Sequence, residues 1–550
     1  MSQPHFTRGA VAAVENEGAL TAADIFRRGG NAADAAIAGA FVQTVVDPWR
    51  TSIGGCAHIQ YYSATEKTTR FIDAGGVAPG GATATMYRPV ARWENAFVVE
   101  NNENRCGYRA QVVPGFIRGM DKLFQRFGSG RLTWRDLIQP AIDRAQQGFA
   151  VHPHLYAAWQ PGQTYTPLGG DPYIALSYSA ESRRLYLKED GSVYRIGEIL
   201  VQQDLAHTLT EIADGGADEF YFGSIARRIA DDFANSGGLL NMADLESFTA
   251  EESAPVSGSY RNLTLVTENA PSVGPTLLEI LNILELADLS SMGWNSPEYL
   301  DYLTQVLYVA FRDRDERVGD PTTGDLDIDT LMSKAHAAEV REQILSGAVR
   351  TQMCAPAPAA ISVPVEHDTT HMTTLDEDGN ACGITHSVGM GTGVVTPGLG
   401  FMHNCHMTNF DPRPGRPNSI APGKRGTGGG APVFAFKGGR VVLSMGSPAG
   451  NFKASAMAQT LVNLIDFGRS LADAVSVDRI HVRCEPPLVI IDHRFAPRAA
   501  LDLAARGYAI EMSDYSARVV AVSKDLAETG FDAASDIRGD RGRELVELAD

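Results

Sequence analysis

The chain has 550 residues, of which 44% are hydrophobic and 21% are charged, a composition typical of a globular protein with a large core. Its net charge of −19 argues against nucleic acid or an anionic membrane surface as a partner. No segment has the apolar run of a secretory signal or a membrane span. The six cysteines are scattered without a Cys-x-x-Cys pair, so we expect reduced thiols and a cytoplasmic protein.

The N-terminal part predicts two helices and a strand. Helical spacing over 17–28 ends at a Gly-Gly pair, and Asn31 can cap a second helix over 32–45. This second helix is apolar nearly all round, so we expect it to be buried. Residues 69–74 read as a strand, and the polar segment 84–106 reads as a surface loop or insertion.

Amphipathic or apolar periodicity predicts further helices over 116–127, 135–147 with Thr133 as N-cap, 203–214, 224–235, 277–289, 299–312, about 452–466 and after Ser470. Alternation predicts strands over 260–267, 433–436 and 440–445. Residues 345–366 are rich in Ala, Pro and Ser and are expected to form a linker.

A hairpin rich in hydroxyl groups follows this linker. Residues 370–375 and 381–388 are predicted as its strands, with Gly379 in the turn. Its hydroxyl-bearing residues are Thr369, Thr370, Thr373, Thr374, Thr385 and Ser387. One interpretation is a strand pair that uses Thr because Thr favours sheets. The other is a Thr nucleophile, which needs an adjacent base such as its own α-amino group, freed by cutting the chain.

Several short motifs decide between these interpretations. They are Arg27–Ala36 (RRGGNAADAA), Ser52–Cys56 (SIGGC), Asp368–His371 (DTTH), Asp376–Ala381 (DEDGNA) and Gly446–Gly450 (GSPAG). Together they resemble the γ-glutamyltranspeptidase family of N-terminal-nucleophile hydrolases over nearly the whole chain. The resemblance implies an α+β fold, a four-layer α/β/β/α sandwich. Periodicity alone supports only mixed α and β structure.

Precursors of this family cut themselves before the first Thr of the Thr-Thr-His run. The match therefore implies a scissile bond between Asp368 and Thr369. Residues 1–368 would form the large piece and 369–550 the small catalytic piece. The two pieces would form a heterodimer, and a dimer of these heterodimers is left open.

The resemblance also implies catalytic roles. Thr369 matches the nucleophile, and Ser387 matches a family Thr whose hydroxyl contacts it. The backbone N–H groups of Ala449 and Gly450 match the oxyanion hole. The family has Gly at both of these positions, so we expect Ala449 to have a negative φ.

The family's substrate clamp is not conserved in this chain. An Arg, an Asp and an Asn of the family align with Gly75, Asn409 and Gly389, and its paired Ser residues align with Gly428 and Gly429. We expect a neutral pocket, which could not pair the zwitterion of a γ-glutamyl group.

Three side chains are hypotheses for the substrate-binding residues that would replace the clamp. Arg50 could supply the lost cation, although it could equally be a surface arginine, and His406 and His403 could line the pocket. His403, Cys405 and His406 also suggest a metal site, but their spacing is too common to support one. We expect no metal and no cofactor.

The sequence thus predicts a self-processing amidohydrolase or acyltransferase, acting on a small amide that is not γ-glutamyl. One alternative is a true γ-glutamyl hydrolase or transferase for glutathione-like substrates. A second alternative is a non-catalytic binding module that keeps the fold.

Overall fold

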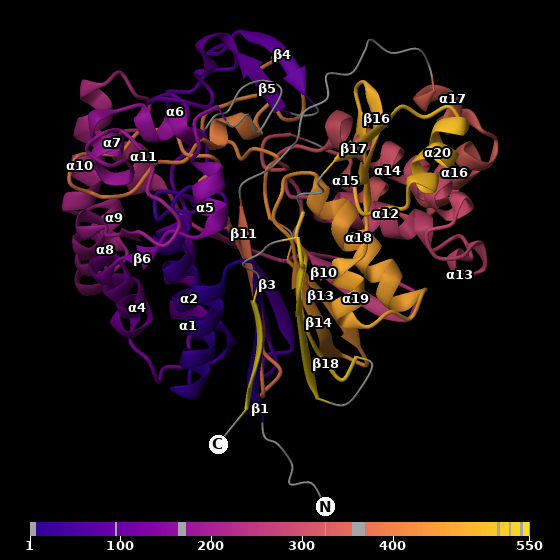
Figure 1. Cartoon of the computed structure of the whole chain (residues 1–550), viewed down its shortest axis with the longest axis horizontal. Coiled ribbons are helices and arrows are strands. Elements are labelled where there is room, and N and C mark those ends of the chain that lie inside the picture. Colours follow the sequence, from indigo (N-terminus) through magenta and orange to yellow (C-terminus); the bar gives the residue numbers. More distant parts are fainter. Residues whose placement is uncertain are drawn as a thin grey trace, which may run out of the picture.

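Two antiparallel sheets pack face to face between two layers of helices (Figure 1). This computed structural model describes residues 7–93, 96–162, 172–324, 326–354, 369–430, 432–513, 517–526, 530–538 and 543–548. The arrangement confirms the predicted four-layer α/β/β/α sandwich. Among these residues, no helix is both long enough and apolar enough to cross a membrane.

The first central sheet combines strands from both ends of the chain and from its middle. Its order is β20 (Arg543–Leu548), β1 (Thr7–Ala13), β11 (Thr370–Asp376), β12 (Ala381–Ser387), β2 (Cys56–Ser63), β3 (Thr68–Ala74) and β8 (Glu251–Ser253). The hairpin β11–β12 lies at its centre, between β1 and β2.

The second central sheet faces the first. Its order is β19 (Phe531–Ser535), β18 (Val520–Lys524), β14 (Arg440–Gly446), β13 (Val433–Lys437), β10 (Leu263–Thr267) and β9 (Val256–Tyr260). Smaller sheets are β15 (Ile480–Cys484), β16 (Pro487–Asp492) and β17 (Ile510–Ser513), the pair β4 (Pro89–Trp93) and β5 (Ala96–Val99), and the pair β6 (Phe149–Ala150) and β7 (Ile199–Leu200).

Helices from the first half of the chain lie on the side of the first sheet (Figure 1). They are α1 (Asn16–Arg27), α2 (Ala32–Val46), α3 (Phe116–Phe127), α4 (Trp134–Gln147), α5 (Pro153–Ala158), α6 (Pro172–Ser177), α7 (Ala180–Tyr186), α8 (Gln203–Gly215), α9 (Asp218–Tyr221), α10 (Ser224–Asn235) and α11 (Met242–Ser247). α2 is buried along its whole length, as its apolar sequence predicts.

The helices on the side of the second sheet come later in the chain (Figure 1). They are α12 (Gly274–Leu284), α13 (Leu289–Met292), α14 (Pro297–Arg317), α15 (Ile328–Leu331), α16 (Lys334–Leu345), α17 (Ala348–Met353), α18 (Phe452–Ile465), α19 (Leu471–Ser476) and α20 (Pro497–Ala505). Two 3₁₀ turns are η1 (Glu100–Asn102) and η2 (His406–Asn409).

Hydroxyl groups of β11 join three of the layers. The side chain of Thr374 donates a 2.8 Å hydrogen bond to the carbonyl of Ala32 in α2. On the opposite face, Thr373 Oγ1 forms a hydrogen bond with Ser444 Oγ in the second sheet. The alternation of β11 therefore sends successive Thr side chains to opposite layers, which accounts for part of the Thr content of the hairpin.

Most predicted elements are confirmed within a few residues, and three differ. The segment 84–106 is not a simple loop, because β4 and β5 form a hairpin in it. The strand predicted over 260–267 is interrupted by a turn at Arg261, which has a φ of 52°, and belongs to two strands. The linker predicted over 345–366 begins with helix α17, and 355–368 lie outside the described residues.

Candidate active site

A cavity of about 170 Å³ opens at the end of the hairpin β11–β12 where Thr369 precedes β11. Its described lining contains many of the residues that the sequence singled out: Thr369, Ser387, Gly389, His406, Asn409, Gly428, Gly429 and Gly450. The cavity thus brings together segments from the hairpin, from the loops around 406–429 and from the start of α18. Asp368, on the other side of the expected scissile bond, lies outside the described residues.

Thr369 and Ser387 lie beside each other at the cavity. The Thr369 hydroxyl donates to Ser387 Oγ across 3.3 Å, which is long for a hydrogen bond between hydroxyls. Ser387 Oγ also accepts a 2.9 Å bond from the backbone N–H of Gly389, which fixes its position. Catalytic hydrogen bonds are often long before substrate binds, so this geometry is compatible with an activated nucleophile.

Ala449 and Gly450 form a turn immediately before α18. The φ of Ala449 is 84° and that of Gly450 is 50°, so the expectation of a negative φ at Ala449 is wrong. A left-handed Ala costs about 1–2 kcal/mol, and such strain often marks functional sites. Within the described part of the chain, neither residue's N–H donates a hydrogen bond. Gly450 lines the cavity, whereas Ala449 is fully buried and is not among its described lining residues.

Arg50 is placed away from this cavity. It is 2% exposed, pairs with Asp47 across 3.4 Å and contacts His154. It is not one of the described residues that line the cavity. Because its charge is already paired inside the first helical layer, the interpretation of Arg50 as the replacement cation is wrong, and so is its reading as a surface arginine.

The cavity is lined by charged side chains that the sequence did not reveal, so the expected neutral pocket is also wrong. His58, Asp73, Arg105, Arg425 and Lys453 all contribute to the lining. Asp73 forms a 3.0 Å ion pair with Arg425. Arg105 comes from the segment that we expected to be a surface loop, and it is only 9% exposed.

His58 occupies the space next to Gly75, where the family has its carboxylate-binding Arg. A Cβ on Gly75 would lie 2.7 Å from His58 Cε1 and 2.8 Å from Nε2. Real Cβ atoms do not come so close, so the imidazole ring and a side chain at position 75 exclude each other. An Arg at position 75 would therefore clash with His58 in its present position.

A buried carboxylate lies behind His58. Glu268 Oε2 is 3.4 Å from His58 Nδ1, and Glu268 is fully buried. Burial alone would lower the pKa of His58, but the Glu268 carboxylate raises it above its usual value. Burial, with Arg314 nearby, lowers the pKa of Lys453, another lining residue, to about 7.

Asn409 similarly fills the space beside Gly428. A Cβ on Gly428 would lie 2.2 Å from Asn409 Nδ2, so the family's Ser could not be accommodated here without movement. At both Gly75 and Gly428, a neighbouring side chain occupies the space that a Cβ would need. The pocket has thus been rebuilt rather than emptied.

The two histidines differ in position. His406 lines the cavity, and burial lowers its pKa to about 3, so it is neutral. His403 is fully buried, contacts Thr396 across 3.0 Å and is not among the described lining residues. The suggestion that His403 lines the pocket is therefore wrong.

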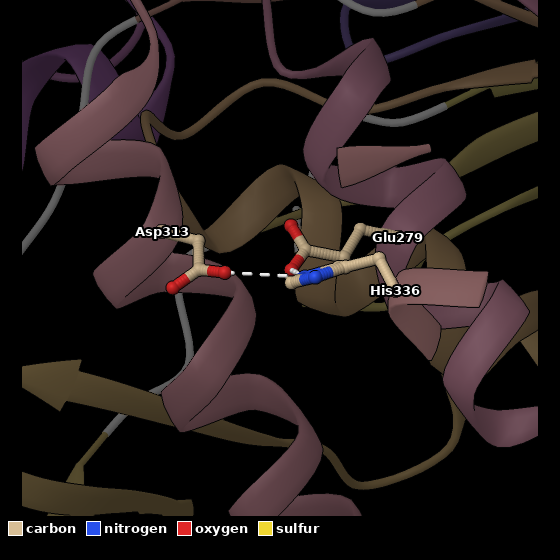
Figure 2. A group of neighbouring side chains, drawn as sticks. All are labelled: Glu279, Asp313 and His336. Carbon is tan, nitrogen blue, oxygen red and sulfur yellow. Dashed lines mark hydrogen bonds and ion pairs between the residues drawn. The ribbon is translucent and has the colours of Figure 1, made fainter. Parts of the chain in front are cut away.

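A separate group, Glu279, Asp313 and His336, has the residue types of a metal site and lies on α12, α14 and α16 (Figure 2). His336 Nε2 is 3.0 Å from Glu279 and 3.2 Å from Asp313. Hydrogen bonds to these carboxylates raise the pKa of His336 to about 9, so an imidazolium supplies the positive charge between them. Arg312 also pairs with Asp313, across 3.1 Å, and no residue of this group lines the described cavity.

The family model of gamma-glutamyltranspeptidase matches residues 18–546. The chain belongs to the gamma-glutamyltranspeptidase family. It is an amide-bond hydrolase or acyltransferase of the self-processing N-terminal-nucleophile type. This family membership agrees with the resemblance drawn from the Thr-Thr-His run and its companion motifs.

Similar proteins include an acylase and a glutathione hydrolase. The chain is 33% identical over 513 residues to the acylase ACY 1 proenzyme of Pseudomonas sp. (strain V22), covering 92% of this chain and 88% of the relative. It is 30% identical over 522 residues to the glutathione hydrolase proenzyme of Escherichia coli (strain K12), covering 92% and 86%. The fold resembles that of cephalosporin acylase from Bacillus halodurans, with a TM-score of 0.83, 24% identity and coverage of 99% and 98%.

Proposed function

We propose that Thr369 is the nucleophile of a self-processing amidohydrolase whose substrate has a small acyl group other than γ-glutamyl. The observation that carries this proposal is the position of Thr369, next to Ser387 and facing a charged cavity that Gly450 also lines. A cavity of about 170 Å³ suits a small acyl group.

Self-processing would begin with attack of Thr369 Oγ1 on the carbonyl carbon of Asp368. The peptide C–N bond breaks, and the acyl group of Asp368 moves from nitrogen to oxygen as an ester. Water then hydrolyses this ester and leaves Thr369 with a free α-amino group. That amine is the base that a Thr hydroxyl needs.

In the catalytic cycle, the amine of Thr369 takes the hydroxyl proton while Oγ1 attacks the substrate carbonyl carbon. The tetrahedral oxyanion would accept hydrogen bonds from the N–H groups of Ala449 and Gly450. Collapse expels the leaving amine, which receives the proton held by Thr369. Water, deprotonated by the same amine, then hydrolyses the acyl-enzyme, or an acceptor amine takes the acyl group.

The two pieces, 1–368 and 369–550, would remain together after the cut. Strand β11 of the small piece is hydrogen-bonded to β1 of the large piece, and β12 is bonded to β2. Separation would therefore break the first central sheet. This interleaving supports a heterodimer of the processed pieces.

The charges around the cavity disfavour a γ-glutamyl group. Its ammonium would need a carboxylate, and the family's Asp is Asn409 here. Asp73 already pairs with Arg425, and Glu268 pairs with His58. An acyl group without the ammonium avoids leaving a buried charge unpaired, and the relatives include an acylase as well as a glutathione hydrolase.

Two anilides that differ in one group test this proposal. Glutaryl p-nitroanilide has the carbon chain of γ-glutamyl p-nitroanilide but lacks its α-ammonium. An unpaired buried charge costs at least 1–3 kcal/mol, or about tenfold to a hundredfold in kcat/KM, so we expect the glutaryl compound to be hydrolysed at least about tenfold more efficiently. Equal or faster hydrolysis of the γ-glutamyl compound would identify a true γ-glutamyl enzyme instead.

A further inference from the structure

We propose that His58, held by Glu268, is the specificity-determining residue of this cavity and binds a carboxylate at the far end of the acyl group. This inference deepens the proposed function, because it names the substrate class of the same site. His58 and Glu268 lie outside the motifs that carry the family resemblance, and they are far apart in the sequence.

The imidazole of His58 lies at the wall of the cavity. His58 is in β2, and its register partners are Asp73 in β3 and Thr385 in β12. Its side chain is 14% exposed and lines the cavity. Nε2 of the ring lies 2.8 Å from the place that a Cβ on Gly75 would take, from which a family Arg would extend. The ring can thus present an N–H to the region that an Arg side chain would otherwise serve.

Glu268 lies in an environment that favours a cation beside it. Its carboxylate is fully buried, and neither oxygen accepts a regular hydrogen bond from the residues that the structure describes. A buried carboxylate without hydrogen bonds is costly unless a cation stands beside it. His58 Nδ1 is at 3.4 Å, so Glu268 favours the protonated ring and fixes which nitrogen points away from the cavity.

The ionisable side chains around the pocket are mostly basic. Arg105, Arg425 and Lys453 line the cavity together with His58, whereas Asp73 is the acidic residue of its described lining. Asp73 is paired with Arg425. Basic residues thus outnumber acidic ones in the described lining. A pocket with this sign favours an anionic acyl group.

Glutarate, the acid that hydrolysis of a glutaryl amide would release, is a direct probe of this site. Its binding to the processed protein can be measured by calorimetry, so the result does not depend on turnover. We expect His58→Gln to weaken glutarate binding by about tenfold or more, as loss of a charged hydrogen bond does. Pentanamide, which has the same chain length and no charge, should show no such dependence on His58.

Two further variants separate recognition from folding. Gly75→Ala keeps His58 but places a methyl group 2.7 Å from its ring, so we expect it to weaken glutarate binding as well. His207→Gln, on the exposed surface of α8, is the matched control and should bind glutarate normally. A normal melting temperature and normal processing will show that each variant is folded.

The pH dependence of glutarate binding distinguishes recognition by His58 from a purely structural role, which would not change it. The charged or titratable groups near His58 are Glu268, Asp73, Lys453 and His406. Because Glu268 raises the pKa of His58, Glu268→Gln should shift the loss of glutarate binding to lower pH. Lys453 also titrates near pH 7, so the His58→Gln protein serves as the reference for its contribution.

The outcomes are distinct. Glutarate binding that depends on His58 supports the inference even if no anilide is hydrolysed. Failure to hydrolyse either anilide would count only against the proposed function. The inference is overturned if the wild-type protein does not bind glutarate at concentrations on the order of 10 mM. It is also overturned if the wild-type protein and the His58→Gln variant bind glutarate equally well. Equal weakening of glutarate and pentanamide would also overturn it, because charge would then not be what His58 recognises.

Discussion

The hydroxyl of Thr369 lies 3.3 Å from that of Ser387. Thr369 comes just before β11, and Ser387 is the last residue of β12, the strand paired with it. Antiparallel pairing of β11 with β12 therefore brings together two residues separated by the whole hairpin. Ser387 is held by the N–H of Gly389, so its oxygen is a fixed partner for the nucleophile. The hairpin thus serves as a rigid platform for chemistry at its open end.

Removing the Ser387 hydroxyl should slow catalysis. We expect Ser387→Ala to lower kcat by about tenfold to a hundredfold, because the nucleophile loses a positioning hydrogen bond. Ser387→Thr keeps the hydroxyl and should retain most activity. Steady-state kinetics with glutaryl p-nitroanilide compares the two, and an unchanged kcat in Ser387→Ala would show that this contact is not used.

The strained turn before α18 should tolerate glycine well. Relief of a left-handed Ala contributes about 1–2 kcal/mol, and the greater freedom of Gly in the unfolded chain costs about 0.4–1 kcal/mol. Ala449→Gly is therefore expected to stabilise the protein by up to about 1 kcal/mol while keeping activity. Thermal unfolding measures this, and a clear loss of stability would contradict the assigned φ.

His58 and Gly75 should be energetically coupled. Gly75→Ala forces the His58 ring to move and should cost about 1–3 kcal/mol, as overpacking does. In a His58→Ala background the same substitution has room, so we expect a coupling free energy of at least about 1 kcal/mol. Urea unfolding of the two single variants and the double variant gives this value. Simple additivity would mean that the two residues do not compete for space.

Four buried histidines should make the fold sensitive to acid. Burial lowers the pKa values of His371, His386, His403 and His406 to about 3. Between about pH 6.5 and 3 the unfolded chain binds protons that the folded chain does not, so stability falls as the pH falls through this window. Each histidine adds a slope of up to about 1.4 kcal/mol per pH unit.

Unfolding free energies at pH 7.5, 6.5 and 5.5 test this expectation. His403 is the suitable residue to replace, because it does not line the described cavity. His403→Gln should reduce the slope without removing it. A flat profile in the wild-type protein would contradict neutral, buried histidines.

The group of Glu279, Asp313 and His336 should be stabilised by its imidazolium rather than by a metal (Figure 2). Because the pKa of His336 is raised to about 9, its contribution is fully present below about pH 6.5 and is lost as the pH rises toward 9. His336→Gln should cost about 3 kcal/mol, since the buried Glu279 carboxylate loses its imidazolium partner, whereas Asp313 keeps its ion pair with Arg312. EDTA should leave the melting temperature unchanged, and a large fall on chelation would indicate a bound metal.

Much of the fold could be predicted because its signals are local. Asn31 and Thr133 form capping boxes with the residues three positions later, and α2 and α4 start where these caps place them. The turn of the central hairpin follows from Gly379, whose φ is 88°. Such features depend on neighbours in the sequence, and the hydrophobic periodicity of the long helices is equally local.

The rebuilt pocket could not be predicted in the same way. His58, Glu268 and Lys453 come from β2, from the end of β10 and from α18, and only the folded sheets bring them together. The position of Lys453, the one charged residue of helix α18, was a signal, since a buried cation needs a partner. Alignment of Gly75 with the family's Arg showed what was lost, but it could not show which side chain filled the space.

The identity of the nucleophile is tested most directly by the intact mass of the purified protein. We expect the wild-type chain to give two pieces that meet between Asp368 and Thr369, and Thr369→Ala to give one uncut chain. Thr370→Val, which changes the next residue at similar size, should still be cut. A folded wild-type protein that remains uncut would lack the N-terminal amine on which this account depends, and would favour a binding module instead.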